Sequence, residues 1–147
     1  MPASLFVDSG VWLAFFSARD GRHRDADRLI REALRRKRPL FTTNLVLAEV
    51  HRLLLHRAGI RPAAAALNVI DQSPGVTVQF VTAAIHDDAR AWLARLDDRV
   101  ISYTDAASFA VMKAKKCTAA LSFDHDFVLA GYSCWDGGVN TKSPTRP

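Results

Sequence analysis

The sequence is poor in cysteine and has no long apolar run. Its two cysteines, Cys117 and Cys134, cannot supply the disulfides of a small secreted domain, and no Cys/His cluster indicates zinc. No segment reaches the about 18–20 apolar residues of a membrane-spanning helix. The opening MPASLFVDSG lacks the basic region of a secretion signal. We therefore expect a cytoplasmic protein with no membrane association.

Glycine and proline are also scarce, with 7 and 6 residues, which excludes collagen-like and low-complexity chains. Hydrophobic residues make up 49% of the 147 residues, which suits one domain with a packed core. Glutamate is scarcer still, because 13 of the 15 acidic residues are Asp and only Glu32 and Glu49 are Glu. The net charge of +5 permits binding to nucleic acid without requiring it.

Strand-like and helix-like segments alternate along the chain. The β-prone runs are residues 4–7, 40–42, 76–81, 119–122 and 132–135. The segments with helical spacing are residues 10–16, 23–37, 45–57, 62–72, 83–96 and 105–115, the last capped by Thr104. This alternation predicts an α/β fold with a central, mainly parallel β-sheet flanked by helices on both faces. We assign residues 1–135 to one domain and the Gly-, Ser- and Pro-containing residues 136–147 to a flexible C-terminal tail.

Several acidic residues lie where open parallel sheets bind ligands, beyond the carboxyl ends of the strands. Asp8 directly follows the first expected strand, Asp124 follows the fourth, and Asp105 begins the helix before that strand. Each has a structural alternative. Asp8 is also placed to cap the next helix, Asp105 to complete a capping box with Ser102, and Asp124 and Asp126 to form a turn.

Glu49 has a weaker structural alternative. It lies in the apolar segment Leu45–Val50, where a buried carboxylate is costly unless it is paired or coordinates a metal. The alternative is a salt bridge to Arg52 at i+3. If Glu49 and the three aspartates converge, their repulsion requires a cation, and carboxylate oxygens suit Mg²⁺ or Mn²⁺.

The charge balance agrees with a phosphodiester enzyme. Without the four acids Asp8, Glu49, Asp105 and Asp124, the remaining chain carries +9. An acidic metal pocket on a basic body can hold the scissile phosphate and its neighbours. The densest basic group, between residues 22 and 38, provides such a body, although a solvated helix face explains it equally.

Four motifs in order resemble those of PIN-domain nucleases. They are Val7-Asp8-Ser9, the segment Thr42–Val50 with Glu49 on a helix, Tyr103-Thr104-Asp105, and Ser122-Phe123-Asp124-His125-Asp126-Phe127. The family more often has Thr where this chain has Ser122. The spacing spans nearly the whole chain, and the compact length is similar to the VapC-type toxins of toxin–antitoxin pairs.

The resemblance implies a Mg²⁺-dependent endoribonuclease, with Mn²⁺ as a substitute, that acts on RNA and is controlled by a cognate antitoxin protein. The implied metal and catalytic acids are Asp8, Glu49, Asp105 and Asp124, with Asp126 as a further metal ligand and Ser9 and Ser122 as supporting hydroxyls. A metal-activated water would leave 5′-phosphate and 3′-hydroxyl ends. We also expect exposed apolar area between helices 45–57 and 62–72, which would receive the antitoxin or form a homodimer.

Two alternatives come from other functional classes. A non-catalytic RNA- or protein-binding module could keep the same fold, but all four acids are present. A metal-dependent phosphatase could use Asp8, but that chemistry favours a lysine near the acids and no lysine precedes Lys37.

Overall fold

The computed structural model describes residues 2–139. The strands are β1 (Leu5–Val7), β2 (Leu40–Thr43), β3 (Val76–Gln79), β4 (Ala119–Leu121) and β5 (Ser133–Cys134). The helices are α1 (Ser9–Phe16), α2 (His23–Arg35), α3 (Asn44–Ala58), α4 (Ile60–Gln72), α5 (Ala83–Arg95), α6 (Tyr103–Ala114) and α7 (Asp126–Leu129).

The strands form one five-stranded sheet in the order β3-β2-β1-β4-β5, and every pairing is parallel. The predicted α/β class and parallel sheet are therefore confirmed. From β1 the chain runs outward through β2 and β3, then crosses back to place β4 and β5 on the other side of β1. The topological switch point thus lies between the ends of β1 and β4, where sheets of this kind bind ligands.

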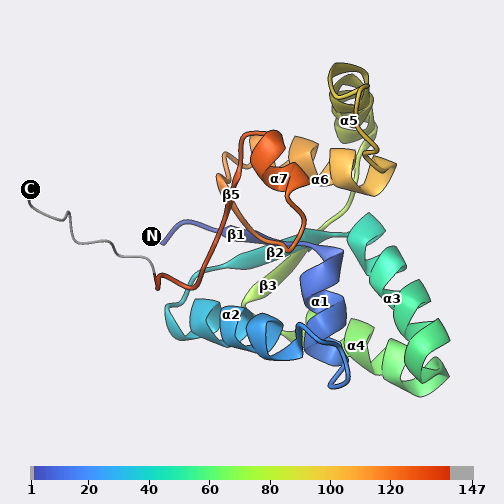
Figure 1. Cartoon of the computed structure of the whole chain (residues 1–147), viewed down its shortest axis with the longest axis vertical. Helices are drawn as coiled ribbons and strands as arrows, with labels where there is room; N and C mark the ends of the chain where they lie inside the picture. The colour runs from blue at the N-terminus through green and yellow to red at the C-terminus, as the bar shows by residue number, and fades with distance from the viewer. Residues whose placement is uncertain (1, 140–147) are drawn as a thin grey trace, which may run out of the picture.

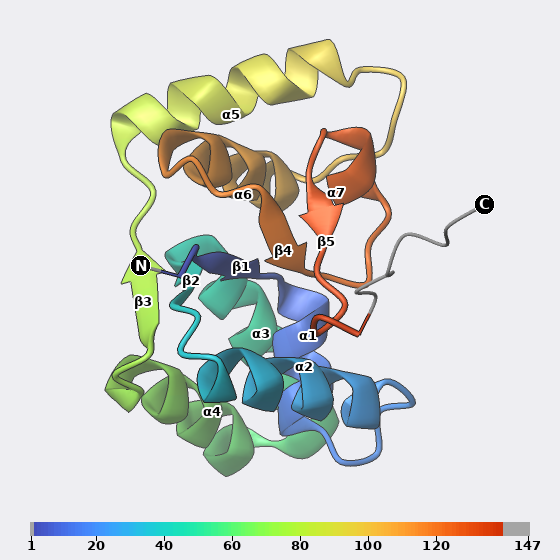
Figure 2. The same cartoon turned by 90° about the vertical axis from the view of Figure 1, so that its left-hand side faces the viewer.

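Helices cover both faces of the sheet, as the sequence predicted. In two perpendicular views, α5, α6 and α7 lie on one side, and α1, α2 and α4 lie on the other (Figures 1 and 2). Helix α3 leaves the end of β2 and packs along α1 and α4. Because β1 is covered on both faces, Leu5, Phe6 and Val7 are all completely buried.

Aromatic rings fix the core around β1. The Phe6 ring packs edge-on against Phe41, with a centroid distance of 5.4 Å, and stacks on Phe127 at 5.9 Å. Phe109 of α6 contacts Phe127 at 5.0 Å. These contacts join the central strand to α6 and to the short helix that follows the fourth motif, so the core itself holds the ends of β1 and β4 in place.

Several helix boundaries differ from prediction by one or two residues, and the short helix α7 was predicted only as a turn. Helix α2 ends at Arg35, two residues before the expected end. Helix α6 begins at Tyr103, and its cap is Ser102, whose Oγ accepts the Asp105 N–H at 3.0 Å. Capping by Thr104 was therefore wrong, because Thr104 lies inside the first turn.

The basic group on α2 is largely paired. Arg31 contacts Asp27 at 2.8 Å and Arg36 contacts Glu32 at 2.8 Å, which supports the solvated-face alternative for these side chains. Arg28 donates to the Asp136 carbonyl at 3.1 Å, so the first residues of the expected tail touch α2. The rest of that tail, residues 140–147, lies outside the described residues, and its flexibility remains a prediction. No helix in the described part is long and apolar enough to span a membrane.

Candidate active site

Asp8 lies at the switch point, directly after β1. It occupies the N-cap position of α1, yet its side chain accepts no helix N–H, so the capping alternative was wrong. Oδ2 instead accepts a hydrogen bond from Ser122 Oγ at 3.1 Å. Oδ1 is buried and has no hydrogen-bond partner among the described residues. A buried carboxylate oxygen without a donor is costly, so this atom is a candidate ligand for a bound cation.

The loop after β4 holds the next two acids. Ser122 Oγ, while donating to Asp8, also accepts the Asp124 N–H at 3.0 Å. Asp124 Oδ1 then accepts the Asp126 N–H at 2.9 Å. The turn alternative for Asp124 is therefore correct as a description of the backbone, and the turn itself brings two carboxylates toward Asp8.

Asp105 joins this group from the first turn of α6. Carboxylate oxygens of Asp105, Asp124 and Asp126 all lie within 4.8 Å of one another. The Asp105 backbone N–H also donates to Ser102 Oγ at the cap of α6. The capping alternative for Asp105 is therefore correct, and it is compatible with a place in the acidic cluster.

Glu49 approaches from α3. Its Oε1 accepts a hydrogen bond from Ser9 Oγ at 3.3 Å, and its side chain is half-buried. Among the described residues it makes no ion pair with Arg52 within 4.0 Å, so the salt-bridge alternative was wrong. Ser9 and Ser122 thus each bond to an acid, as supporting hydroxyls would.

Burial and mutual repulsion raise the pKa of three of these carboxyls. Burial, followed by repulsion from Asp105, raises the pKa of Asp8 to about 7. Burial also raises the pKa of Asp105 to about 6, with contributions from Asp124, Glu49 and Asp126. The pKa of Asp126 is raised by burial and by Asp124. Asp105 is therefore coupled electrostatically to Asp8 and to Asp124, Glu49 and Asp126, and a positive charge at this place would stabilise the ionised forms of Asp8 and Asp105.

A divalent cation fits this site. The donor set is made of carboxylate oxygens, which hard cations such as Mg²⁺ and Mn²⁺ prefer. Asp8 Oδ1 has no partner among the described residues, and carboxylate oxygens of Asp105, Asp124 and Asp126 cluster beside it in the same acidic site. The structure thus provides an acidic cluster able to hold a metal.

Two arginines lie near the acids, and the sequence had singled out only Arg22, as a member of the basic group between residues 22 and 38. Arg99 lies close enough to Asp126 to lower the pKa of that carboxyl in part. Arg22 stacks on the Phe123 ring at 3.8 Å, beside Asp124. Both lie in loops, where no periodic pattern predicts the direction of a side chain.

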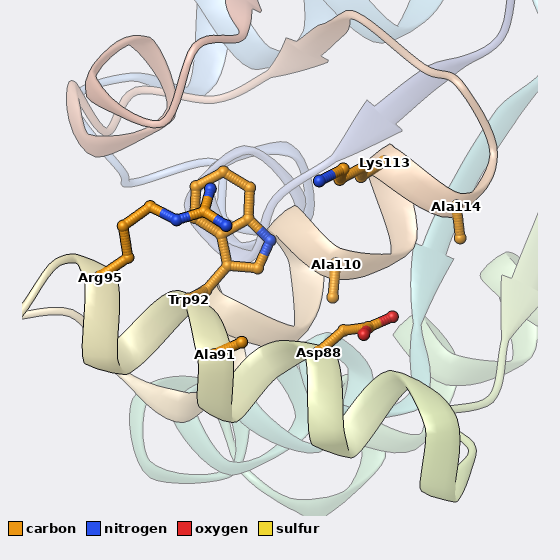
Figure 3. A pocket seen from close by; sticks show the side chains of 7 residues that line it. All are labelled: Asp88, Ala91, Trp92, Arg95, Ala110, Lys113 and Ala114. Atoms are coloured by element: carbon orange, nitrogen blue, oxygen red, sulfur yellow. The ribbon is translucent and has the colours of Figure 1, made fainter.

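A separate hollow lies between α5 and α6. The Arg95 guanidinium covers the Trp92 ring at 4.5 Å, and Asp88 and Lys113 complete the rim (Figure 3). None of the clustered acids lines it. We therefore place the reaction at the switch point, where the hydrogen-bonded carboxylates are.

The fold and the acidic site define the class, and comparison with known proteins agrees. The PIN-domain family model matches residues 5–131, and the chain belongs to the PIN-domain family. It is similar to the 23S rRNA-specific endonuclease VapC20 of two strains of Mycobacterium tuberculosis, CDC 1551 and H37Rv. Identity is 43% over 129 residues, covering 87% of this chain and 95% of the relative.

Solved structures of similar fold agree with the sequence comparison. The crystal structure of M. tuberculosis VapC20, a sarcin–ricin loop cleaving toxin, aligns with a TM-score of 0.81 and 42% identity. The alignment covers 90% of this chain and 99% of that one. FitAcB from Neisseria gonorrhoeae, at 13% identity and a TM-score of 0.63, shares the fold over 90% of this chain and 97% of its own. The predicted resemblance to VapC-type PIN ribonucleases is confirmed, and the chain is a metal-dependent endoribonuclease of that toxin type.

Proposed function

We propose that this endoribonuclease uses Mg²⁺, with Mn²⁺ as a substitute, and that Asp8, Glu49, Asp105, Asp124 and Asp126 form its metal site. The observation that carries this proposal is the buried, unpartnered Oδ1 of Asp8 beside a cluster of carboxylates whose pKa values are raised. A non-catalytic module would have no need to maintain this costly arrangement.

The chain's own residues have distinct roles in the proposed reaction. The five acids would hold the metal, which when bound lowers the pKa of water and neutralises charge on the scissile phosphate. Ser122 fixes the orientation of Asp8 and Asp124 through its two hydrogen bonds. Ser9 does the same for Glu49. Because the nucleophile is water, the products would carry 5′-phosphate and 3′-hydroxyl ends.

The substrate we propose is ribosomal RNA. VapC20 is named for 23S rRNA and for cleavage of the sarcin–ricin loop, and it shares 43% of residues with this chain over nearly its whole length. A ribosomal substrate would also place the enzyme in the cytoplasm.

We propose that an antitoxin protein covers the apolar groove between α3, α4 and β3. The groove is lined mainly by Leu47, Leu67, Val78 and Phe80, and Phe80 is 66% exposed. Among the apolar residues of α3, Val46, Val50 and Leu54 face the core, which leaves Leu47 for this groove. A second copy of the chain is the other occupant we expect, in a homodimer.

The proposed function is tested by incubating the purified chain with 23S rRNA in Mg²⁺ or in EDTA and sequencing the new 5′ ends. We expect discrete, Mg²⁺-dependent cuts whose downstream fragments carry 5′-phosphate. Hydrolysis of a small phosphomonoester with no cut in RNA would favour the phosphatase alternative. Co-expression with a small adjacent reading frame, followed by purification through a tag on one partner, tests the antitoxin.

A further inference from the structure

A groove adjoins the acidic site on the side of α3. It has a volume of about 450 Å³ and lies between α3 and the start of α6. Its lining residues are Leu45, Ala48, Glu49, Arg52, Ser102 and Thr104. Glu49 belongs both to this groove and to the acidic site. A ligand in the groove would therefore lie next to the acidic site.

The Arg52 guanidinium is a cation without a partner in the described protein. It is exposed, and no carboxylate of residues 2–139 lies within 4.0 Å of it. Its helical neighbour at i−3, Glu49, bonds to Ser9 of α1 instead. Many other arginines of the chain have local ion pairs or carbonyl partners, such as Arg31, Arg36 and Arg57.

The rest of the groove suits a nucleotide. Leu45 and Ala48 supply an apolar surface, and Ser102 and Thr104 supply polar groups at the opposite wall. The volume falls within the roughly 300–1,000 Å³ of small-molecule sites. An RNA chain that enters a strongly acidic site also needs cations for the phosphates beside the metal-bound one, because the carboxylates repel them.

We infer that this groove seats the nucleotide next to the scissile phosphate, and that Arg52 binds the phosphate of that nucleotide. The inference rests on the proposed ribonuclease function and adds to it a binding residue for the RNA. Arginine suits the role because its planar fork matches two phosphate oxygens at once.

The test compares Arg52→Ala, Arg52→Lys and the matched control Arg61→Ala in the full chain. Arg61 is exposed in the first turn of α4, beyond the far end of α3. The substrate is a labelled RNA hairpin of the sarcin–ricin loop with Mg²⁺, and kcat/KM is measured over a range of KCl concentrations. Binding of the same RNA is measured in EDTA, so that the result does not depend on cleavage.

We expect Arg52→Ala to lower kcat/KM by about 10- to 100-fold and to weaken RNA binding. The slope of log affinity against log salt should become shallower by about 0.7, as for one lost phosphate contact to a single strand. Arg52→Lys should restore the slope while recovering only part of kcat/KM, and Arg61→Ala should change neither.

An Arg52→Ala protein with unchanged RNA affinity and salt slope would overturn the inference while leaving the ribonuclease function intact. A loss of activity with an unchanged salt slope would likewise overturn it, because that pattern belongs to a structural role. Loss of antitoxin binding alone would assign Arg52 to the protein partner. Absence of any RNA cleavage by the unsubstituted chain would instead contradict the proposed function.

Discussion

Replacing Asp8 with Asn should stabilise the metal-free protein at alkaline pH. Asp8 is only 5% exposed, and its Oδ1 has no hydrogen-bond donor among the described residues. Asn has nearly the same shape, keeps an oxygen to accept from Ser122, and offers an amide that can donate to the neighbouring carboxylates. The substitution therefore removes a buried charge without leaving a cavity.

The magnitude follows from the pKa. Folding raises the pKa of Asp8 from the usual value of 3.8 to about 7, which corresponds to about 4 kcal/mol as an upper limit. For an acid whose folded pKa is raised, ionisation costs stability. The cost is absent below about pH 4, where the carboxyl is protonated in both states. It grows as the pH rises and reaches its full size above about pH 7.

The assay is urea unfolding of the native chain and Asp8→Asn in EDTA at pH 4, 6 and 8. We expect a negligible difference at pH 4 and an advantage for Asp8→Asn of up to about 4 kcal/mol at pH 8, or roughly 8–16 °C in Tm. Asp87→Asn, which removes an exposed charge on α5, should show no such pH dependence. Added Mn²⁺ should reverse the order, because the native chain binds it more tightly.

Two outcomes would contradict this prediction for Asp8→Asn. If Asp8→Asn were less stable than the native chain at pH 8 without metal, the charge of Asp8 would be stabilising and the metal would not be its missing partner. If the difference were the same at pH 4 and pH 8, the effect would come from packing or from hydrogen bonds rather than from ionisation.

Four further predictions address the site and the core. Asp105→Asn should lower RNA cleavage at least about 100-fold with an unchanged circular dichroism spectrum, because the amide is a poorer cation ligand. Ser122→Ala should weaken Mn²⁺ binding about 10- to 100-fold in calorimetry, whereas Ser122→Thr should retain most of it. Glu49→Gln should raise the metal-free Tm by less than Asp8→Asn does, since Glu49 is only half-buried; a fall in Tm would contradict this. Phe127→Ala should cost about 3–5 kcal/mol in urea unfolding, because its ring is fully buried against two others.

The sequence predicted what depends on short-range patterns. Continuous apolar runs identified β1 and β2, and the acids at strand ends identified Asp8 and Asp124, because parallel strands end at one edge of the sheet. The apolar surroundings of Glu49 in the sequence marked it as a site candidate, but its approach to Ser9 depends on how α3 packs against α1. The helical i+3 rule offered Arg52 only as an alternative partner, since that rule considers one helix by itself.

Contacts between distant segments could not be predicted from spacing. Ser122 stood out only through the family motif, and its double role as donor to Asp8 and acceptor from Asp124 depends on the pairing of β4 with β1. The prediction of the α6 cap was wrong for a different reason. Ser102 and Thr104 are both residue types that cap helices well, and the tertiary path of the loop decides between them.

The order of the strands has a consequence for how the enzyme is made. β1 is synthesised first, yet one of its two neighbours is β4, and the hydrogen bond from Ser122 to Asp8 spans 114 positions of the chain. A nascent chain that has emerged only through α5 carries Asp8 and Glu49 without Asp105 or Asp124. If the proposed site is correct, the acidic cluster is incomplete until β4 has emerged and paired with β1, so cleavage activity appears only when synthesis of the domain is nearly finished.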